Sequence, residues 1–108
     1  MVIYEVNLTV DAEIADDYAA WLGPHIKEIL EVDGFLSAEW FEVEADGEDY
    51  VHWCVQYRVK DRTALETYFV EHADRLRGDG LERFGGRFTA ERRILSRSAS
   101  IGQEISLN

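Results

Sequence analysis

The sequence has 108 residues, of which 46% are hydrophobic and 12% aromatic, and its formal net charge is −11 at pH 7. This length is typical of one domain, and the apolar content excludes a chain that is disordered throughout. The acidic charge disfavours nucleic acid as a partner, no apolar run is long enough to cross a membrane, and the single cysteine, Cys54, excludes an internal disulfide.

The chain begins with a strand pattern and continues with a helix pattern. Residues 2–10 alternate between apolar and mixed side chains, which is typical of a strand that buries one face. Asp11 stands where a helix N-cap is expected, and apolar residues then recur at helical spacing over residues 14–30. Gly23-Pro24 interrupts this pattern, because proline donates no backbone hydrogen bond, and it predicts a kink or a short restart of the helix.

Two further strand patterns follow, joined by a polar turn. Asp33-Gly34 ends the first helix, and residues 35–44 and 50–60 both alternate with period two. The turn between them, residues 45–49, contains Asp46-Gly47. These patterns predict an antiparallel hairpin.

A second helix is expected after this hairpin. Asp61 is its candidate N-cap, and its apolar stripe runs from Leu65 through His72 to Leu76. The glycines in Gly78-Asp79-Gly80 predict a break, followed by one short helical turn over residues 81–84.

The last strand pattern covers residues 87–97, with Phe88, Ala90 and Ile94 on one face. The resulting order, β-α-β-β-α-β, predicts an α+β, ferredoxin-like domain over residues 1–97, with both helices on one face of an antiparallel four-stranded sheet in the order 4-1-3-2. Residues 98–108 are polar with isolated apolar residues, and we expect a flexible tail.

Alternation assigns the strand side chains to two faces. The face under the helices is apolar, and on the second strand it includes Leu36, Ala38 and Trp40. The opposite face is half polar, which suits either a wet ligand surface or packing against a second sheet. We therefore expect a homodimer through the helix-free face, with candidate interface residues Ile3, Glu5, Asn7, Phe41, Arg58 and Arg93.

Several segments resemble an uncharacterised bacterial family, known as a domain of unknown function, within the dimeric α/β-barrel superfamily. The resemblance covers about residues 2–97 and includes Gly34-Phe35-Leu36-Ser37-Ala38 and Val55-Gln56-Tyr57-Arg58. Its most distinctive part is Glu71-His72-Ala73, followed by Arg75-Leu76-Arg77 and Gly80-Leu81-Glu82-Arg83-Phe84-Gly85. The resemblance implies two protomers that pack sheet against sheet, and it implies no reaction.

Aromatic and histidine side chains of the helix-covered side are candidates for a ligand pocket between helices and sheet. The main hypothesis is a non-catalytic protein, or one that binds a small apolar molecule there. The candidate pocket residues are Tyr4, His25, Trp40, Trp53 and His72. The histidines and the single thiol lack a short metal-ligand spacing, so neither a metal nor another cofactor is expected.

An enzyme is the first alternative. The wider superfamily includes cofactor-independent monooxygenases of aromatic compounds and haem-degrading enzymes, whose sites use an asparagine on the first strand, an aromatic residue on the third and often a helical histidine. Asn7, Trp53 or Tyr57, and His72 are similar candidates. Alternation places Asn7 on the face opposite Trp53 and Tyr57, so a shared pocket would need a bulge.

An interaction module is the second alternative, because positive charge gathers late in the chain. Residues 1–60 hold fourteen acidic and three basic residues, whereas residues 61–108 hold eight of each. We expect the arginines between residues 75 and 97 to pair with acids of the first half or of a partner subunit, although they could instead form a face for a different protein. The N-terminus has no basic leader, which predicts a cytoplasmic location.

Overall fold

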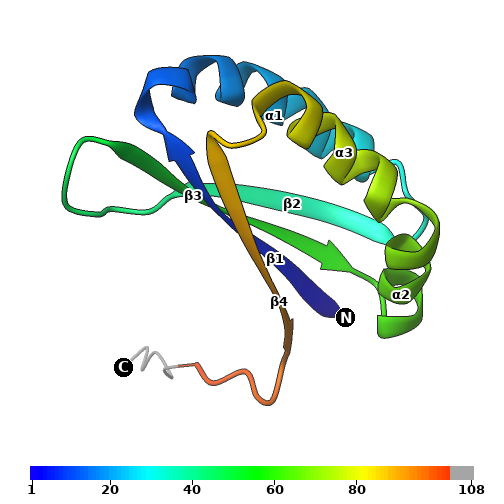
Figure 1. Ribbon diagram of the computed structural model, residues 1–108. Helices are drawn as coiled ribbons and strands as arrows, with labels where there is room; N and C mark the ends of the chain where they lie inside the picture. The colour runs from blue at the N-terminus through cyan, green and yellow to red at the C-terminus, as the bar shows by residue number, and fades with distance from the viewer. Residues whose placement is uncertain (103–108) are drawn as a thin grey trace, which may run out of the picture.

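Four antiparallel strands form one sheet in the order β2-β3-β1-β4, and the helices lie on one of its sides (Figure 1). The computed structural model describes residues 1–102. The strands are β1 (Val2–Asp11), β2 (Phe35–Glu42), β3 (Tyr50–Val59) and β4 (Phe88–Ser96). The helices are η1 (Ala12–Ile14), α1 (Ala15–Ile29), α2 (Arg62–Glu71) and α3 (Ala73–Phe84). The predicted ferredoxin-like fold and its strand order are confirmed.

The two predicted caps are present where strands pass into helices. The Asp11 carboxylate accepts a hydrogen bond from the backbone N–H of Glu13 at 2.9 Å, at the start of η1. Asp61 accepts one from the backbone N–H of Ala64 at 2.8 Å, at the start of α2. Each carboxylate satisfies an N–H group that has no partner within its helix, and so fixes the point at which the chain leaves the sheet.

The register of the central strands decides which side chains face the helices. Tyr4 of β1 lies opposite Tyr57 of β3 and Ile94 of β4. Side chains at paired positions point to the same side of a sheet, so these three face the helices. Tyr4 and Tyr57 are each 2% exposed and belong to a core that also includes Leu65 and Leu76, both fully buried.

The start of β2 differs from the predicted alternation. A register shift between Phe35 and Ser37 inserts one extra residue there. As a result Phe35 turns into the core at 7% exposure, and Leu36 is 61% exposed. The assignment of Leu36 to the apolar face was therefore wrong, because a bulge reverses the direction of every residue on one side of it.

Gly34, just before this bulge, brings the chain close to α2. Its φ of +89° is favourable only for glycine, and a Cβ atom there would lie 2.6 Å from the Cβ of Ala64. Its carbonyl accepts a hydrogen bond from the N–H of Lys60 at 2.8 Å. This contact places the beginning of β2 beside the end of β3.

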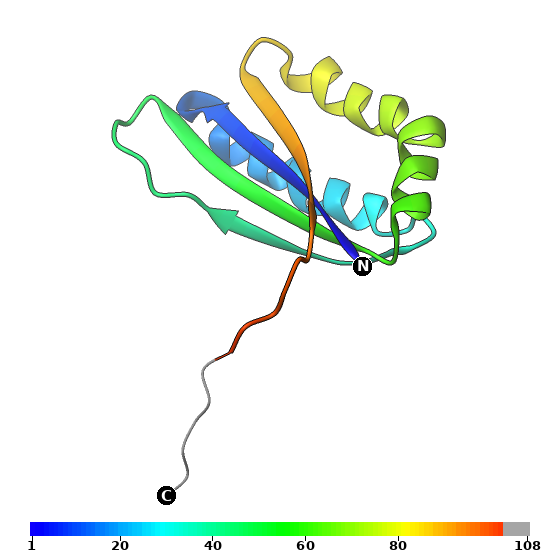
Figure 2. The same ribbon diagram turned by 90° about the horizontal axis from the view of Figure 1, so that it is seen from below.

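The second helical segment also differs from the prediction, because it divides at His72 and not at the glycines. His72 has φ −128° and ψ −30°, and α2 and α3 run at a large angle to each other on either side of it (Figure 2). α3 then continues through Gly78-Asp79-Gly80 to Phe84, so the predicted break there is wrong. Pro24 likewise lies inside a single α1 that does not restart.

Beyond β4 the chain leaves the domain. Residues 97–102 form no helix or strand. The rest of the predicted tail, residues 103–108, lies outside the described residues.

Candidate functional site

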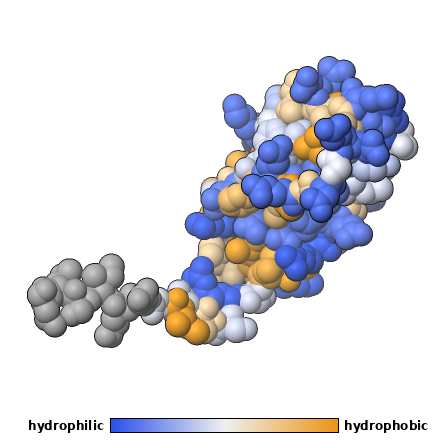
Figure 3. Space-filling model, turned by 90° about the vertical axis from the view of Figure 1, so that its left-hand side faces the viewer, coloured by the Kyte–Doolittle hydropathy of each residue, from blue (hydrophilic) through white to orange (hydrophobic). Residues whose placement is uncertain are grey.

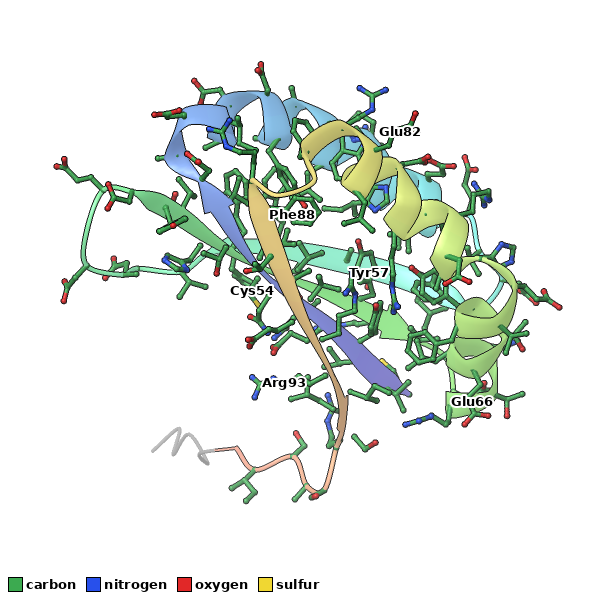
Figure 4. The ribbon with its side chains drawn as sticks, viewed as in Figure 1. Cys54, Tyr57, Glu66, Glu82, Phe88 and Arg93 are labelled. Carbon is green, nitrogen blue, oxygen red and sulfur yellow. The ribbon has the colours of Figure 1, made fainter. Side chains whose placement is uncertain are left out.

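A cavity lies between the sheet and helices α1 and α3. It is narrow, since only about 50 Å³ of it can hold the centre of a water molecule. All elements except η1 and β2 contribute to its lining. Tyr57 and Phe88 lie on the helix side of the sheet, whereas Cys54 and Arg93 lie on the other side (Figure 4). Its position between helices and a sheet, with a mostly apolar and aromatic lining, is typical of small-molecule sites.

Four tyrosines form much of the cavity wall: Tyr4, Tyr18, Tyr57 and Tyr68. The rings of Tyr4 and Tyr57 stack with centroids 5.9 Å apart, and Tyr68 lies 5.8 Å from Tyr4. Burial raises the pKa of Tyr68 to about 12, and it raises the pKa of Tyr18 and Tyr57 further. At neutral pH these three hydroxyls are therefore uncharged hydrogen-bonding groups.

Arg77 brings a guanidinium group from α3 to the same cavity. One of its terminal nitrogens, Nη2, donates to the hydroxyl oxygen of Tyr4 at 3.1 Å, and the group lies 5.8 Å from the ring centroid of Phe69. Its Nε is buried and has no hydrogen-bond partner among the described residues. A buried donor without a partner is costly, and so this nitrogen is available to a ligand.

Arg92 reaches the cavity from β4, between the apolar residues Ala90 and Ile94 of the same face. Its side chain is exposed, so it marks an open side of the cavity. Its charge opposes the effect of burial on the pKa of Tyr18, Tyr57 and Tyr68. Arg92 therefore lies within electrostatic reach of three cavity hydroxyls.

His25 and Trp21 of α1 form the opposite wall. Their rings stack with centroids 4.2 Å apart and an interplanar angle of 23°. Burial lowers the pKa of His25, against the opposing influence of Glu28 and Asp79. Its Nδ1 is buried without a hydrogen-bond partner among the described residues. The imidazole is thus a neutral ring with one free hydrogen-bonding position.

Of the five predicted pocket residues, Tyr4 and His25 line this cavity. Trp53 stacks on Tyr18 at 6.1 Å, behind the wall, and Trp40 meets Trp53 edge-on at 5.3 Å. His72 lies at the junction of α2 and α3, 3.9 Å from Glu71. The predicted set is therefore not gathered in one place, because the cavity follows the seam between α1 and α3.

Two arginines of the cavity, Arg77 and Arg92, were not among the predicted pocket residues. Arg92 carried a usable signal, because it interrupts the apolar row formed by Phe88, Ala90 and Ile94. A charged residue within an apolar row marks a polar position on a buried face. For Arg77 a comparable signal was its position one helical turn after Ala73, on the apolar stripe of its helix.

The main buried polar group of the helix-free face is the carboxylate of Glu5. Glu5 is 2% exposed and accepts hydrogen bonds from Arg93, from Asn7 at 2.9 Å and from Gln56 at 2.9 Å. The hydrogen bond from Arg93 is the main reason that the pKa of Glu5 falls from 4.5 to about 2. Burial and the nearby Glu5 charge raise the pKa of the Cys54 thiol, so this cysteine is a poor nucleophile.

The six predicted interface residues all lie on this helix-free face. Ile3 pairs with Arg58, Glu5 with Arg93, and Asn7 and Phe41 both pair with Cys54. Arg58 also contacts Glu39 at 3.4 Å within the same chain. The arrangement keeps the six residues together on one surface, and their role in an interface stays a prediction.

Three of the seven arginines between residues 75 and 97 pair with acids of the first half, which agrees with the expectation for these three. Arg75 contacts Glu28 at 3.0 Å, and Arg87 contacts Asp11 at 2.9 Å and Glu13 at 3.1 Å. Arg93 pairs with Glu5. These residues point in different directions, so they form no single basic surface.

Comparison with known proteins agrees with this fold. Residues 1–98 match the family described as Domain of unknown function (DUF4286). The chain belongs to this family. No curated protein sequence matches it.

Solved structures with the same fold include enzymes of low sequence identity. SnoaB, a cofactor-independent oxygenase from Streptomyces nogalater, is 11% identical with a TM-score of 0.67, over 94% of this chain and 98% of that one. HapK from Hahella chejuensis is 13% identical with a TM-score of 0.68, over 98% and 100%. The haem-degrader MhuD from Mycobacterium tuberculosis, solved with two haems in its active site, is 14% identical with a TM-score of 0.66, over 94% and 100%. At these identities the likeness shows the fold alone.

Two features are absent from residues 1–102. None of the helices there is long and apolar enough to span a membrane. Within the same residues, no three histidine, cysteine or acidic side chains are grouped as metal ligands.

Proposed function

We propose that this protein binds a small, mainly apolar molecule in the cavity between α1, α3 and the sheet. The observation that carries the proposal is the lining of this narrow cavity, which is walled by tyrosine, tryptophan and phenylalanine rings and also holds unpartnered polar atoms of Arg77 and His25. Filling such a space with side chains is the usual outcome in a folded core, so an unfilled aromatic space at the seam of two helices favours a ligand. A cytoplasmic location, expected from the sequence, stays part of this proposal.

The oxygenase alternative has less support from the geometry. Asn7 faces the helix-free side, where it donates to Glu5, whereas Trp53 packs under α1 against Tyr18. His72 lies at the far end of α3, beside Glu71. Tyr57, the other expected aromatic residue, lines the cavity, but Asn7 and His72 do not, so oxygenation there would need partners other than those expected.

The test is a titration of the protein with haem and with neutral aromatic compounds, indole and naphthol, followed by NMR. We expect the neutral aromatics to shift resonances of the cavity tyrosines and Trp21. Ala90 lines the cavity, so Ala90→Phe should fill it and abolish these shifts. Ala45→Phe, in the exposed turn, is the matched control and should leave binding unchanged. Binding that survives Ala90→Phe in a folded protein would contradict the proposal.

We also propose that the working form is a homodimer through the helix-free face. Ile3 and Leu95 are only partly buried there, and Phe41 is 44% exposed. A second copy related by a two-fold axis would bury these apolar side chains, at about 25 cal/mol for each Å² removed from water. Figure 3 shows another side of the molecule, with the β2–β3 turn toward the viewer, where apolar patches alternate with hydrophilic ones.

Light scattering after gel filtration tests the dimer. The wild-type chain should have a dimer mass at micromolar concentration, and Arg58→Glu should shift it toward the monomer by placing a second acid beside Glu39 in the interface. Asp46→Lys, also a reversal of charge but in the exposed turn, should leave the mass unchanged. A monomer mass for the wild-type protein would exclude this assembly.

A further inference from the structure

Both charged side chains that line the cavity, Arg77 and Arg92, are basic, and among the described residues no aspartate or glutamate lines it. This is unusual in a chain whose net charge is −11. Five other arginines have carboxylate partners, as Arg75 has Glu28 and Arg87 has Asp11. Within residues 1–102, neither Arg77 nor Arg92 has one.

Arg77 is prepared to hold a carboxylate. Its guanidinium is partly buried, and a buried cation without a counter-charge is costly. Its Nε is unpartnered while one Nη2 hydrogen is directed to Tyr4. A planar guanidinium fork matches the two oxygens of a carboxylate, so an anion here would satisfy both the free nitrogen and the charge.

Tyr4 adds a second donor at the same place. Its hydroxyl oxygen accepts the hydrogen bond from Arg77, which leaves its own hydrogen without a partner among the described residues. Arg92 is paired with Val6 of β1, and Val6 and Tyr4 lie two residues apart on the same side of the sheet, so Arg92 stands near Tyr4. Arg77, Arg92 and the tyrosine hydroxyls therefore surround one part of the cavity.

The rest of the wall suits a flat ring. Trp21 and His25 present stacked rings, and Tyr18 meets Trp21 at 5.4 Å and Phe88 at 5.1 Å. The space is too narrow for a bulky aliphatic group, because so little of it admits the centre of a water molecule. Aromatic walls attract planar rings through stacked and edge-on contacts.

The two sides of the cavity differ in charge, so an anionic ligand would approach from one of them. The outer side of Trp21 and His25 faces a surface hollow bordered by three acids, Glu28, Asp79 and Glu82, and by one arginine, Arg83, so the net charge of its border disfavours anions. Arg92, in contrast, is exposed on the edge strand β4 and belongs to the cavity lining. An anion is thus attracted to the side of the cavity formed by β4.

We infer that the cavity takes a small aromatic carboxylate, with its carboxylate at Arg77, Tyr4 and Arg92 and its ring against Trp21, His25 and Tyr18. This inference rests on the proposed function, since it names the class of molecule bound in the same cavity. The ligand enters past Arg92 and replaces the missing counter-charge of both arginines.

The experiment compares naphthoate with naphthamide of the same ring position by isothermal titration calorimetry. The two probes share ring, size and shape and differ in charge. Naphthoate should bind about tenfold or more tightly than naphthamide, because charge-assisted hydrogen bonds are about twice as strong as neutral ones. The preference should fall as salt is added, since Arg92 is exposed.

Two variants locate the anion. Arg77→Met and Arg92→Gln should each reduce naphthoate affinity about tenfold or more and leave naphthamide affinity nearly unchanged. Arg92→Gln changes an exposed side chain, so it decides the matter even if Arg77→Met does not fold. Arg75→Gln removes the same charge from an exposed position on α3 and is the control, with no expected effect on either probe.

The outcomes separate this inference from the proposed function. Selective loss of naphthoate binding in both cavity variants supports the inference. Equal or tighter binding of naphthamide to the wild-type protein overturns it while the proposed ligand cavity stands. Failure of both probes and of the neutral aromatics overturns the proposed function as well.

Discussion

The helix-covered and helix-free faces of the sheet both hold buried polar groups, but they satisfy them differently. On the helix-free face, Glu5 is 2% exposed and is completed within the chain by Arg93, Asn7 and Gln56. On the helix-covered face, Arg77 keeps an unpartnered Nε and His25 an unpartnered Nδ1 among the described residues. The polar group on the helix-free face has all its partners within the chain, which is typical of a structural role. The polar groups on the helix-covered face still lack partners, and for this reason we propose ligand binding in the cavity.

The largest expected effect tests which side chains belong to the helix-covered face. Phe35→Ala should destabilise the protein by about 3–5 kcal/mol, because it removes a buried aromatic ring and leaves a cavity. The ring of Phe35 lies 5.0 Å from Tyr68 and 5.9 Å from Tyr57, both core residues. Urea unfolding followed by circular dichroism measures the change.

Leu36→Ala is the matched control, one residue further along β2. Leu36 is 61% exposed, so its loss should change the free energy of unfolding by no more than about 0.5 kcal/mol. If Leu36→Ala proved the more damaging of the two, the bulge between Phe35 and Ser37 would be misplaced and the faces of β2 reversed.

The same pair of residues shows what the sequence could predict of this fold. Alternation and the two aspartate caps were sufficient for the order β-α-β-β-α-β and for the faces of β1 and β3. At Phe35-Leu36 two apolar residues are adjacent, and alternation alone cannot decide which of them is buried. The choice is made by tertiary contact, since Gly34 is held against Ala64 of α2.

The cavity was less predictable, because its residues come from elements far apart in the chain. Tyr4 and His25 could be proposed from their positions on apolar faces. Arg77 and Arg92 resembled ordinary surface charges, and only the packing of α3 over the sheet brings them to one space. The helix break predicted at the glycines of α3 was wrong for a similar reason. Each glycine weakens a helix by about 1 kcal/mol, but the packing of α3 against the rest of the domain outweighs this cost.

The second prediction tests whether the hydrogen-bonded carboxylate of Glu5 stabilises the helix-free face. Because folding lowers the pKa of this carboxyl from 4.5 to about 2, the charged form stabilises the folded state. This stabilisation is complete above about pH 5 and is lost as the pH falls from 4.5 toward 2. At neutral pH, Glu5→Gln should cost about 1–3 kcal/mol, a range that allows for the solvent exposure of Arg93.

Urea unfolding from pH 7 to pH 2 at one protein concentration measures this contribution. The variant Glu5→Gln should lose less stability on acidification than the wild-type protein does. Glu39→Gln is the control on the same face, because Glu39 is exposed and pairs with the exposed Arg58. It should change stability by no more than about 0.5 kcal/mol. If the free energy of unfolding fell equally with pH in the wild type and in Glu5→Gln, the Glu5 carboxylate would not be the group that stabilises this face.

The smallest expected effect tests how closely α3 covers the sheet. Gly78 lies inside α3 with open space where a Cβ atom would stand, so Gly78→Ala should stabilise the protein by about 0.5–1 kcal/mol. At Gly80, two residues later, a Cβ would lie 3.0 Å from Cη2 of Trp21, in the cavity wall. Gly80→Ala must therefore displace Trp21, and the gain in helix stability should be cancelled or reversed. Urea midpoints of the two variants give the comparison directly.

A Gly80→Ala variant as stable as Gly78→Ala would mean that α3 lies further from α1 than the structure has it. If neither alanine stabilised the protein, the helix would break at these glycines, as the sequence first indicated, and the wall that carries Arg77 would be lost.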